Sequence, residues 1–186
     1  MNIRRATSSD ADALAKVHID AWRMAYRGLV PDSYLDSLDF DLRAERFRES
    51  LATGKGETYV AEGDQGVLGF LTIGVCRDPE LAGEPVGEIW GIYLAPRHWR
   101  RGIGRLLCRR GEEMLASRHY TQAVLWVFDG NQAARGFYEA MGYGTDGASK
   151  VLNPGAPLKA IRYRKRLTSA EPSAPAIGAP TAVAEL

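Results

Sequence analysis

Hydrophobic positions along the chain change their spacing several times, and the spacing predicts alternating helices and strands. Residues 10–26 carry apolar side chains at the period of a helix: Ala11, Leu14, Ala21, Trp22 and Ala25. Residues 123–128 form a continuous apolar run, as expected for a strand covered on both faces. We predict strands at 2–6, 57–62, 67–76, 86–94, 121–128, 143–150 and 159–167, and helices at 10–26, 32–52, 102–117 and from the turn at 129–131 to 141.

This order predicts an α/β fold: a single domain over residues 1–167, with a mixed sheet and helices on both faces. Strands 86–94 and 121–128 flank helix 102–117, so they form a βαβ unit and are expected to be parallel. Gly111 falls inside that helix at a cost of ~1 kcal/mol relative to alanine, and the sequence gives no reason for it. Residues 168–186 are rich in alanine and proline, which predicts a disordered tail.

Composition narrows the class of protein. The formal net charge of +1 gives no strongly basic surface for nucleic acid. No apolar run approaches the ~20 residues of a membrane span, and the N-terminus lacks the apolar core of a signal peptide. The two cysteines, Cys76 and Cys108, form no disulfide or zinc motif. We expect a cytoplasmic protein with no metal and no nucleic-acid or membrane partner; a homodimer is left open.

The segment from Arg100 to Arg105, RRGIGR, predicts a main-chain binding site for a pyrophosphate. Helix N-terminal amides lack internal partners and favour an anion, and glycines would let phosphates approach them. Arginines at the same helix end are locally unfavourable unless an anion binds there. The alternative is a glycine-rich turn with a solvated basic face. The spacing fits neither a Rossmann fingerprint, because Leu107 replaces the third glycine, nor a Walker loop.

Two segments resemble signatures of the GNAT superfamily of N-acetyltransferases. Residues 96–107, PRHWRRGIGRLL, are similar to its motif A, Gln/Arg-x-x-Gly-x-Gly/Ala. Residues 131–143, NQAARGFYEAMGY, resemble Asn-x-x-Ala-x-x-Phe-Tyr-x-x-x-Gly-Phe. The resemblance covers residues 2–167. Trp99 replaces the first motif A residue, so a phosphate contact from that side chain is in doubt, and Arg100 or Arg101 would supply the charge instead.

The resemblance implies an acetyl-CoA-dependent N-acetyltransferase, in which an amine attacks the donor directly in a ternary complex. The alternative is a non-catalytic acyl-CoA sensor or interaction module. Backbone groups of residues 92–94 would hold the pantetheine arm like an added strand, and an amide of that stretch would stabilise the oxyanion. The implied cofactor-binding residues are Ile92, Tyr93, Leu94, Arg100, Arg101, Gly102, Ile103, Gly104, Arg105, Asn131, Ala134 and Tyr138.

Candidate catalytic residues follow from the same resemblance and from proton bookkeeping. Tyr138 would protonate the leaving thiolate, with core packing as the alternative; Phe137 beside it suits the core better. Glu88 is the best candidate for a base, with a solvated strand-end glutamate as the alternative. Asn131 could cap its helix, reach the pantetheine, or do both. The remaining candidates have no catalytic motif: His18 is expected to be partly buried, His98 and His119 exposed, and Cys108 packed.

The acceptor side is expected between the first two helices, where the candidate substrate-binding residues are Trp22, Tyr26 and Leu29, together with Trp90 on a strand. The alternative for Trp22 and Tyr26 is a core position at helical spacing. A polyamine or aminoglycoside would need an acidic pocket, for which the nearby residues are Asp32, Asp36, Asp39 and Asp41. A peptide or lysine would need an open groove, and the sequence does not choose.

Overall fold

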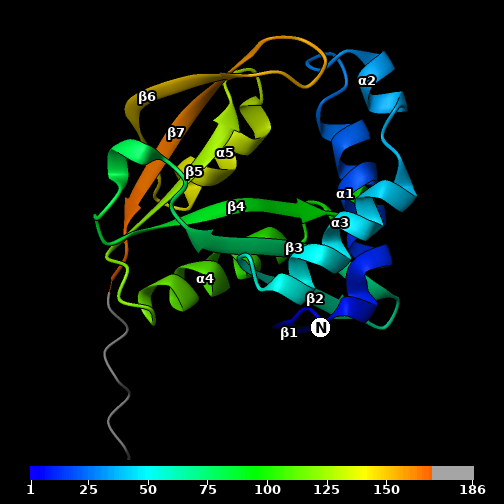
Figure 1. The fold of residues 1–186 in the computed structure, drawn as a ribbon, viewed down its shortest axis with the longest axis horizontal. Helices are drawn as coiled ribbons and strands as arrows, with labels where there is room; N and C mark the ends of the chain where they lie inside the picture. The colour runs from blue at the N-terminus through cyan, green and yellow to red at the C-terminus, as the bar shows by residue number, and fades with distance from the viewer. Residues whose placement is uncertain (169–186) are drawn as a thin grey trace, which may run out of the picture.

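A computed structural model describes residues 1–168, so the predicted tail at 168–186 lies outside the described residues apart from Thr168. One sheet of seven strands has the order β1-β2-β3-β4-β5-β7-β6, in which β4 and β5 are parallel and the other neighbours antiparallel. The α/β fold and the parallel pair are confirmed (Figure 1). The strands are β1 (Asn2–Arg5), β2 (Glu57–Gly63), β3 (Gly66–Val75), β4 (Val86–Leu94), β5 (Gln122–Phe128), β6 (Gly144–Leu152) and β7 (Leu158–Arg166).

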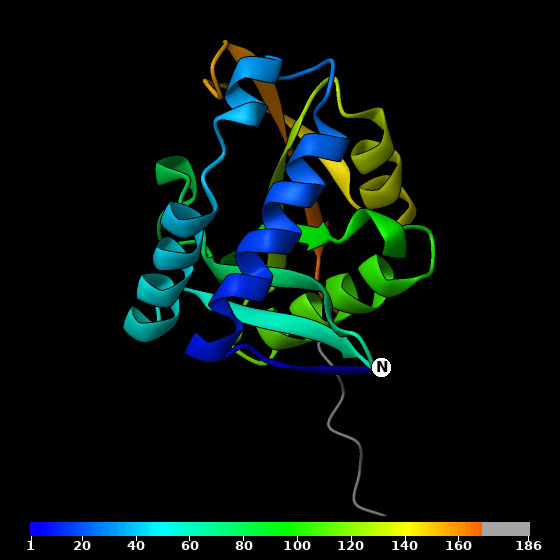
Figure 2. The ribbon, with the colours of Figure 1, turned by 90° about the vertical axis from the view of Figure 1, so that its right-hand side faces the viewer.

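Helices cover the two faces of the sheet, as predicted. Figure 2 shows α1 crossing the near face with α3 beside it, while α4 and α5 lie behind and to the side. Leu14, Val60 and Phe70 belong to the core under α1 and α3, whereas Leu71, Leu107 and many others form the larger core under α4 and α5. The α-helices are α1 (Ala11–Ala25), α2 (Asp32–Asp36), α3 (Phe40–Thr53), α4 (Ile103–Ala116) and α5 (Gln132–Ala140), with 3-10 turns at Ser8–Asp10, Pro79–Leu81 and Pro96–His98.

The predicted helix 32–52 is wrong as a single element. The chain leaves the helical conformation at Asp39, which has φ −87° and ψ 128°. The Asp39 side chain accepts a hydrogen bond from the Leu42 amide at 2.7 Å and so caps a new helix, α3. In α3, which begins after this break, Leu42 is 53% exposed and Ala44 is buried.

The structure explains the glycine inside α4. A Cβ at Gly111 would lie 2.9 Å from the Leu71 Cδ2 and 3.3 Å from the Ile73 Cγ2, so α4 packs directly on β3 there. Cys108 on the same helix is fully buried, as predicted, and burial raises the pKa of its thiol to about 12. The close packing of α4 on β3 therefore offsets the ~1 kcal/mol that glycine costs in helix propensity.

In residues 1–168, none of the helices has both the length and the apolar character needed to cross a lipid bilayer.

Candidate active site

The site begins where β4 and β5 separate. Their parallel pairing runs from Val86 opposite Gln122 to Ile89 opposite Leu125, and no further. β4 nevertheless continues to Leu94, still paired with β3. A bulge at Trp90, where the β3 register shifts, marks the point of separation. Beyond it, one edge of β4 faces a gap instead of a strand.

The alternation of an antiparallel pair decides which backbone groups face that gap. The Ala95 amide donates to the Leu68 carbonyl at 2.9 Å, so Leu94 points its own amide and carbonyl away from β3. By the same alternation Ile92 also faces the gap, whereas the polar backbone groups of Tyr93 face β3. Of the three residues predicted to offer backbone groups, Ile92 and Leu94 therefore provide the open edge, and Tyr93 does not.

The loop after β4 has an unusual backbone. Arg100 and Gly102 both have left-handed conformations, with φ 58° and φ 80°, and Gly102 is the N-cap of α4. A Cβ at Gly102 would meet nothing within 4 Å, so the space beside it is open. The Trp99 indole donates to the Leu94 carbonyl at 2.8 Å, so this replacement for the usual motif residue ties the loop to β4.

Gly104 has a different reason to be a glycine from the one predicted. A Cβ there would lie 3.3 Å from the Leu94 Cδ1 and 3.5 Å from the Phe137 ring. The missing side chain thus brings α4 close to β4 and α5, and does not itself clear room for phosphates. Ile103 beside it is a buried core residue, so its contribution to an anion site is its main-chain amide.

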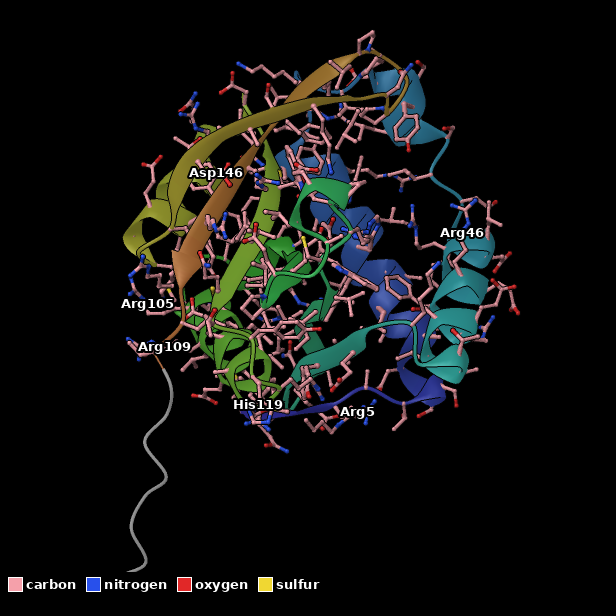
Figure 3. All side chains as sticks on the ribbon, turned by 60° about the vertical axis from the view of Figure 1, so that its left-hand side comes forward. Arg5, Arg46, Arg105, Arg109, His119 and Asp146 are labelled. Atoms are coloured by element: carbon pink, nitrogen blue, oxygen red, sulfur yellow. The ribbon has the colours of Figure 1, made fainter. Side chains whose placement is uncertain are left out.

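Four arginines surround the N-terminal half of α4, and we call them the donor arginines: Arg100, Arg101, Arg105 and Arg109. All four are exposed, and within residues 1–168 none makes an ion pair or a side-chain hydrogen bond. Figure 3 shows Arg105 and Arg109 together, on the opposite side of the molecule from Arg46 of α3. Unpaired cations at a helix N-terminus fit a bound polyanion.

The start of α5 is fixed by its cap. The Asn131 side chain accepts from the Ala134 amide at 3.1 Å, which confirms the capping alternative and leaves the Asn131 amide nitrogen as a donor. The Ala134 amide is used in this bond, so only its partly buried methyl group can contact a ligand. Gly142 ends the helix with φ 86°, as predicted.

Tyr138 is buried in the larger core and only 8% exposed, whereas Phe137 packs against that core from its edge. The expectation that Phe137 is the core residue and Tyr138 the outer one is wrong in this respect. Burial raises the pKa of Tyr138 well above its ordinary value, and the nearby Cys108, Tyr26 and Tyr93 raise it further. Because Tyr26 and Tyr93 belong to the α1 side of the sheet, the Tyr138 phenol lies close to the gap between β4 and β5.

Glu88 is not a solvated strand-end residue, because its side chain is 1% exposed and lies in a full hydrogen-bond set from Arg77. The Arg77 backbone amide and Nε donate to Glu88 Oε2 at 2.9 and 3.1 Å, and Nη2 donates to Oε1. The same guanidinium lies 4.7 Å from the centroid of the Trp90 ring. Glu88 thus fixes Arg77 by hydrogen bonds, and the Arg77 guanidinium fixes the Trp90 ring by a cation–π contact.

The predicted acceptor residues fall into two groups. Trp22 and Tyr26 contact each other, with ring centroids 4.7 Å apart, and Tyr26 also contacts Phe128 at the end of β5. Leu29 lies against the turn before α5, where a Cβ on Gly130 would be 2.7 Å from its Cδ2. These side chains pack beside the carboxyl end of β5. Trp90 lies apart from them, in the wall of a cavity.

That cavity, of about 210 Å³, lies under α1 and α3 on the face opposite α4. Its floor is β4, at Trp90, Gly91 and Tyr93, so it adjoins the backbone that borders the gap. The remaining wall residues, from α1, α3, β2 and β3, are His18, Arg43, Arg46, Phe47, Ser50, Thr58, Phe70 and Thr72. None of Asp32, Asp36, Asp39 and Asp41 lines it, and all four are exposed.

Sequence reasoning missed the two arginines of this wall, Arg43 and Arg46, which we call the cavity arginines. They lie three residues apart on α3, which places them on one face of that helix. That spacing was the available signal, but the predicted long helix 32–52 assigned them no neighbours.

The three histidines differ in their surroundings. His18 is 6% exposed, more buried than predicted, and burial with the nearby Arg43 lowers its pKa to about 3. Its Nδ1 has no hydrogen-bond partner. His98 was predicted to be exposed but is 9% exposed, because the turn at Pro96–His98 folds it inward to accept from the Arg97 Nε at 2.9 Å. His119 is exposed, as predicted.

A strand gap leading to an arginine-rich helix N-terminus is the arrangement that the sequence resemblance implied, and a family model agrees with it. The model of the acetyltransferase (GNAT) family matches residues 18–143. The chain belongs to the GNAT family. It is an acetyl-CoA-dependent N-acetyltransferase, which confirms the predicted enzyme class and donor; the sensor alternative is not favoured.

Known relatives resemble the chain over most of its length. An uncharacterised N-acetyltransferase of Bacillus subtilis, YuaI, is 31% identical over 141 residues, 75% of this chain and 78% of the relative. A spermidine N(1)-acetyltransferase of Thermoplasma acidophilum is 20% identical over 82% of this chain and 95% of its own. The crystal structure of PaiA N-acetyltransferase from Thermoplasma acidophilum with coenzyme A has TM-score 0.72 at 18% identity, covering 89% of this chain and 98% of that one.

Proposed function

We propose that this GNAT enzyme moves the acetyl group directly from acetyl-CoA to an amine, with the donor bound in the gap between β4 and β5. One observation carries the proposal: β4 outruns its pairing with β5 and ends, through the loop 95–102, at the N-terminus of α4. A donor with a pyrophosphate at one end and an amide-bearing arm matches this path. Its thioester supplies an activated acyl carbon, and the chain supplies position and polarity.

The phosphate end is held by the main chain and by charge. The amides of Ile103, Gly104 and Arg105, at the start of α4, precede the first helical hydrogen bond, which runs from the Leu106 amide to the Gly102 carbonyl, and they point out of the helix end. Gly102 leaves their approach open, and the donor arginines supply positive charge. Trp99 takes no part in this contact, because its indole is bound to Leu94.

The arm lies along the open edge of β4. Ile92 offers an amide and a carbonyl, and Leu94 offers its amide, since Trp99 already occupies its carbonyl. An arm with two amides pairs with such an edge as an added strand does. This places the acyl end near the Trp90 bulge, where a free amide of β4 would stabilise the negative charge that develops on the acyl oxygen.

The Tyr138 phenol acts as the acid for the leaving thiolate. Burial keeps this phenol protonated throughout the working pH range, as a donor must be. Its high pKa means that tyrosinate does not accumulate, so the hydrogen bond to sulfur matters more than complete proton transfer. The oxygen of the Asn131 side chain caps α5 and its amide group lies toward the Tyr26 hydroxyl, so Asn131 would contact the donor from the α5 side.

Glu88 is reassigned from base to positioning residue. The Glu88 carboxylate is 1% exposed and accepts three hydrogen bonds from Arg77, so an acceptor amine has no direct access to it. The Arg77 guanidinium in turn lies over the Trp90 ring, so Glu88 helps to fix the indole in the cavity floor. A cytoplasmic location, the lack of a metal and of nucleic-acid or membrane partners, and a homodimer stay predictions.

The test is initial-rate kinetics with acetyl-CoA and a panel of amines, following thiol release and the mass of the acetylated amine. Direct attack predicts intersecting double-reciprocal lines and no acetyl-enzyme in the intact mass. Parallel lines with an acetylated protein would replace the ternary complex by a covalent route. Tight acetyl-CoA binding without thiol release for any amine would return the sensor.

A further inference from the structure

The cavity beside Trp90 carries positive charge that the enzyme class does not explain. Its wall contains Arg43 and Arg46 but no aspartate or glutamate. Within residues 1–168 neither arginine makes an ion pair or a side-chain hydrogen bond. Arg48, on the same helix, pairs with both Glu45 and Asp12, so acidic partners are available to α3 and are placed elsewhere.

Arg43 carries its positive charge in surroundings that destabilise the charge. It is half-buried, and both burial and the nearby Arg46 lower its pKa, which means that its charge is destabilised where it stands. Its charge acts on His18 and Tyr93, and both side chains line the cavity. Because Arg43 makes no ion pair within residues 1–168, its guanidinium is available to the negative group of a ligand.

A second residue of the same wall adds no negative charge to it. His18 is 6% exposed, and its Nδ1 is buried and makes no hydrogen bond within residues 1–168. Its ring stacks on Trp22 at 5.5 Å and contacts Tyr93 at 4.7 Å, so it is fixed in place. Burial first and the nearby Arg43 second lower the pKa of His18 to about 3, so the ring is neutral and the charge of the cavity wall comes from the arginines.

We propose that the acceptor is an amine that also carries an anionic group, a carboxylate first of all, which the cavity arginines bind while the amine faces the acyl end at Trp90 and Gly91. This inference rests on the proposed function. The guanidinium fork of Arg43 matches a carboxylate, Thr58, Thr72 and Ser50 offer hydroxyl groups, and aromatic rings line the rest. The relative named for spermidine acts on a polycation, and this cavity is built for the opposite charge.

The experiment uses two series of amines that differ only in one end group. The first is 4-aminobutanoate, 4-aminobutanamide and 1,4-diaminobutane; the second is leucine, leucinamide and 3-methylbutylamine. For at least one series, we expect kcat/KM to be about tenfold or more higher for the acid than for the amide. The diamine should be the poorest of the first series. Equal values across both series, or a preference for the diamine, would overturn the inference.

Variants locate the effect. Arg43→Gln should raise KM for the acid about tenfold or more, with the KM for acetyl-CoA unchanged and the amide unaffected, while Arg43→Lys should keep part of the preference. Arg48→Gln is the matched control, since it removes the same charge from α3 outside the cavity. A loss that is equal for acid, amide and diamine would assign Arg43 to the fold alone. Arg46→Gln serves the same purpose if Arg43→Gln does not fold.

A binding measurement separates this inference from the proposed function. Calorimetric titration of the CoA-saturated protein with 4-acetamidobutanoate and 4-acetamidobutanamide, or with N-acetylleucine and its amide, requires no turnover. Tighter binding of the acid, lost in Arg43→Gln, supports the anion site even if no thiol is released in the kinetic assay. Equal binding of acid and amide refutes the anion site even if acetyl transfer is rapid.

Discussion

The donor arginines and the cavity arginines, which make no ion pairs among residues 1–168, differ in burial, position and neighbours. The donor arginines follow a glycine motif, are exposed, and surround the N-terminal half of α4 on one face of the sheet. The cavity arginines lie on α3 on the other face, where Arg43 is half-buried against His18 and Tyr93. Figure 3 shows Arg46 and Arg105 far apart in this view, projecting from different helices.

The difference teaches how charge is used on the two sides of the acyl group. On the donor side, we propose that exposed cations attract a large polyanion whose main contacts are backbone amides. On the acceptor side, we propose that a half-buried guanidinium in a cavity selects among small molecules by the charge of their end group.

The largest expected effect lies between the two groups, at Tyr138. Tyr138→Phe should lower kcat about 10²-fold, with the KM values for acetyl-CoA and acceptor nearly unchanged. Because the pKa of this phenol is raised well above its ordinary value, the wild-type kcat should show no loss from Tyr138 ionisation up to about pH 10.

The control is Tyr143→Phe, which removes the hydroxyl of a neighbouring buried tyrosine on the same core, beside Cys108 and Glu112. Its kcat should stay close to that of the wild type. A wild-type kcat in Tyr138→Phe would remove the phenol from the chemistry and leave Tyr138 as a core residue.

The next effect concerns His18 in the cavity wall and the pH dependence of the free energy of unfolding. The folded-state pKa of His18 is lowered to about 3, by burial first and by Arg43 second. The unfolded chain therefore binds a proton below about pH 6.5 that the folded chain refuses, so stability is full above that pH and falls as the pH drops. Between pH 7 and pH 5 the loss from this one group is about 2 kcal/mol.

His18→Leu should flatten the pH dependence of the free energy of unfolding over this range, measured by urea denaturation, whatever it does to stability at pH 7. The exposed His119→Leu should leave the slope as it is. An unchanged slope in His18→Leu would mean that burial and Arg43 do not lower the pKa of His18 in the folded protein.

A smaller effect concerns the backbone of the donor loop. Gly102→Val places a branched side chain at φ 80°, which disfavours the loop by ~1–2 kcal/mol and fills the open approach to the helix amides. We expect KM for acetyl-CoA to rise about tenfold or more, while the ratio of kcat/KM for acid and amide acceptors stays constant.

Gly147→Val is the matched control, because Gly147 has φ 89° and open space but lies in β6, away from the donor loop. It should lower stability without changing either KM. If Gly147→Val raised KM for acetyl-CoA as much as Gly102→Val does, general destabilisation would account for both.

The smallest effect belongs to single donor arginines. Arg105→Gln should raise KM for acetyl-CoA only about two- to fivefold, less at high salt, because exposed charges are screened. With S-acetylpantetheine, which lacks the pyrophosphate, the variant and the wild type should be equal. Arg5→Gln on β1 removes the same charge from an exposed site and should change neither donor. Equal losses with both donors would place Arg105 outside the phosphate contact.

The sequence by itself determined the donor side of this protein. Strand period, the glycine and arginine cluster after residue 95 and the Asn131–Gly142 signature are local features, and local features set strand, turn and cap geometry directly. The parallel βαβ unit, the bounds of β4 and the Gly142 helix end followed from them.

Only the tertiary structure decided the acceptor side. Which backbone groups of residues 92–94 face the gap depends on the register with β3, and the burial of Glu88 depends on Arg77, both set by contacts between distant segments. Gly104 and Gly111 acquire their reasons from neighbours on other elements. No motif marks Arg43 in the sequence. It lies in one cavity wall with His18, over β4, only because α3 begins anew at Asp39 and packs across the sheet.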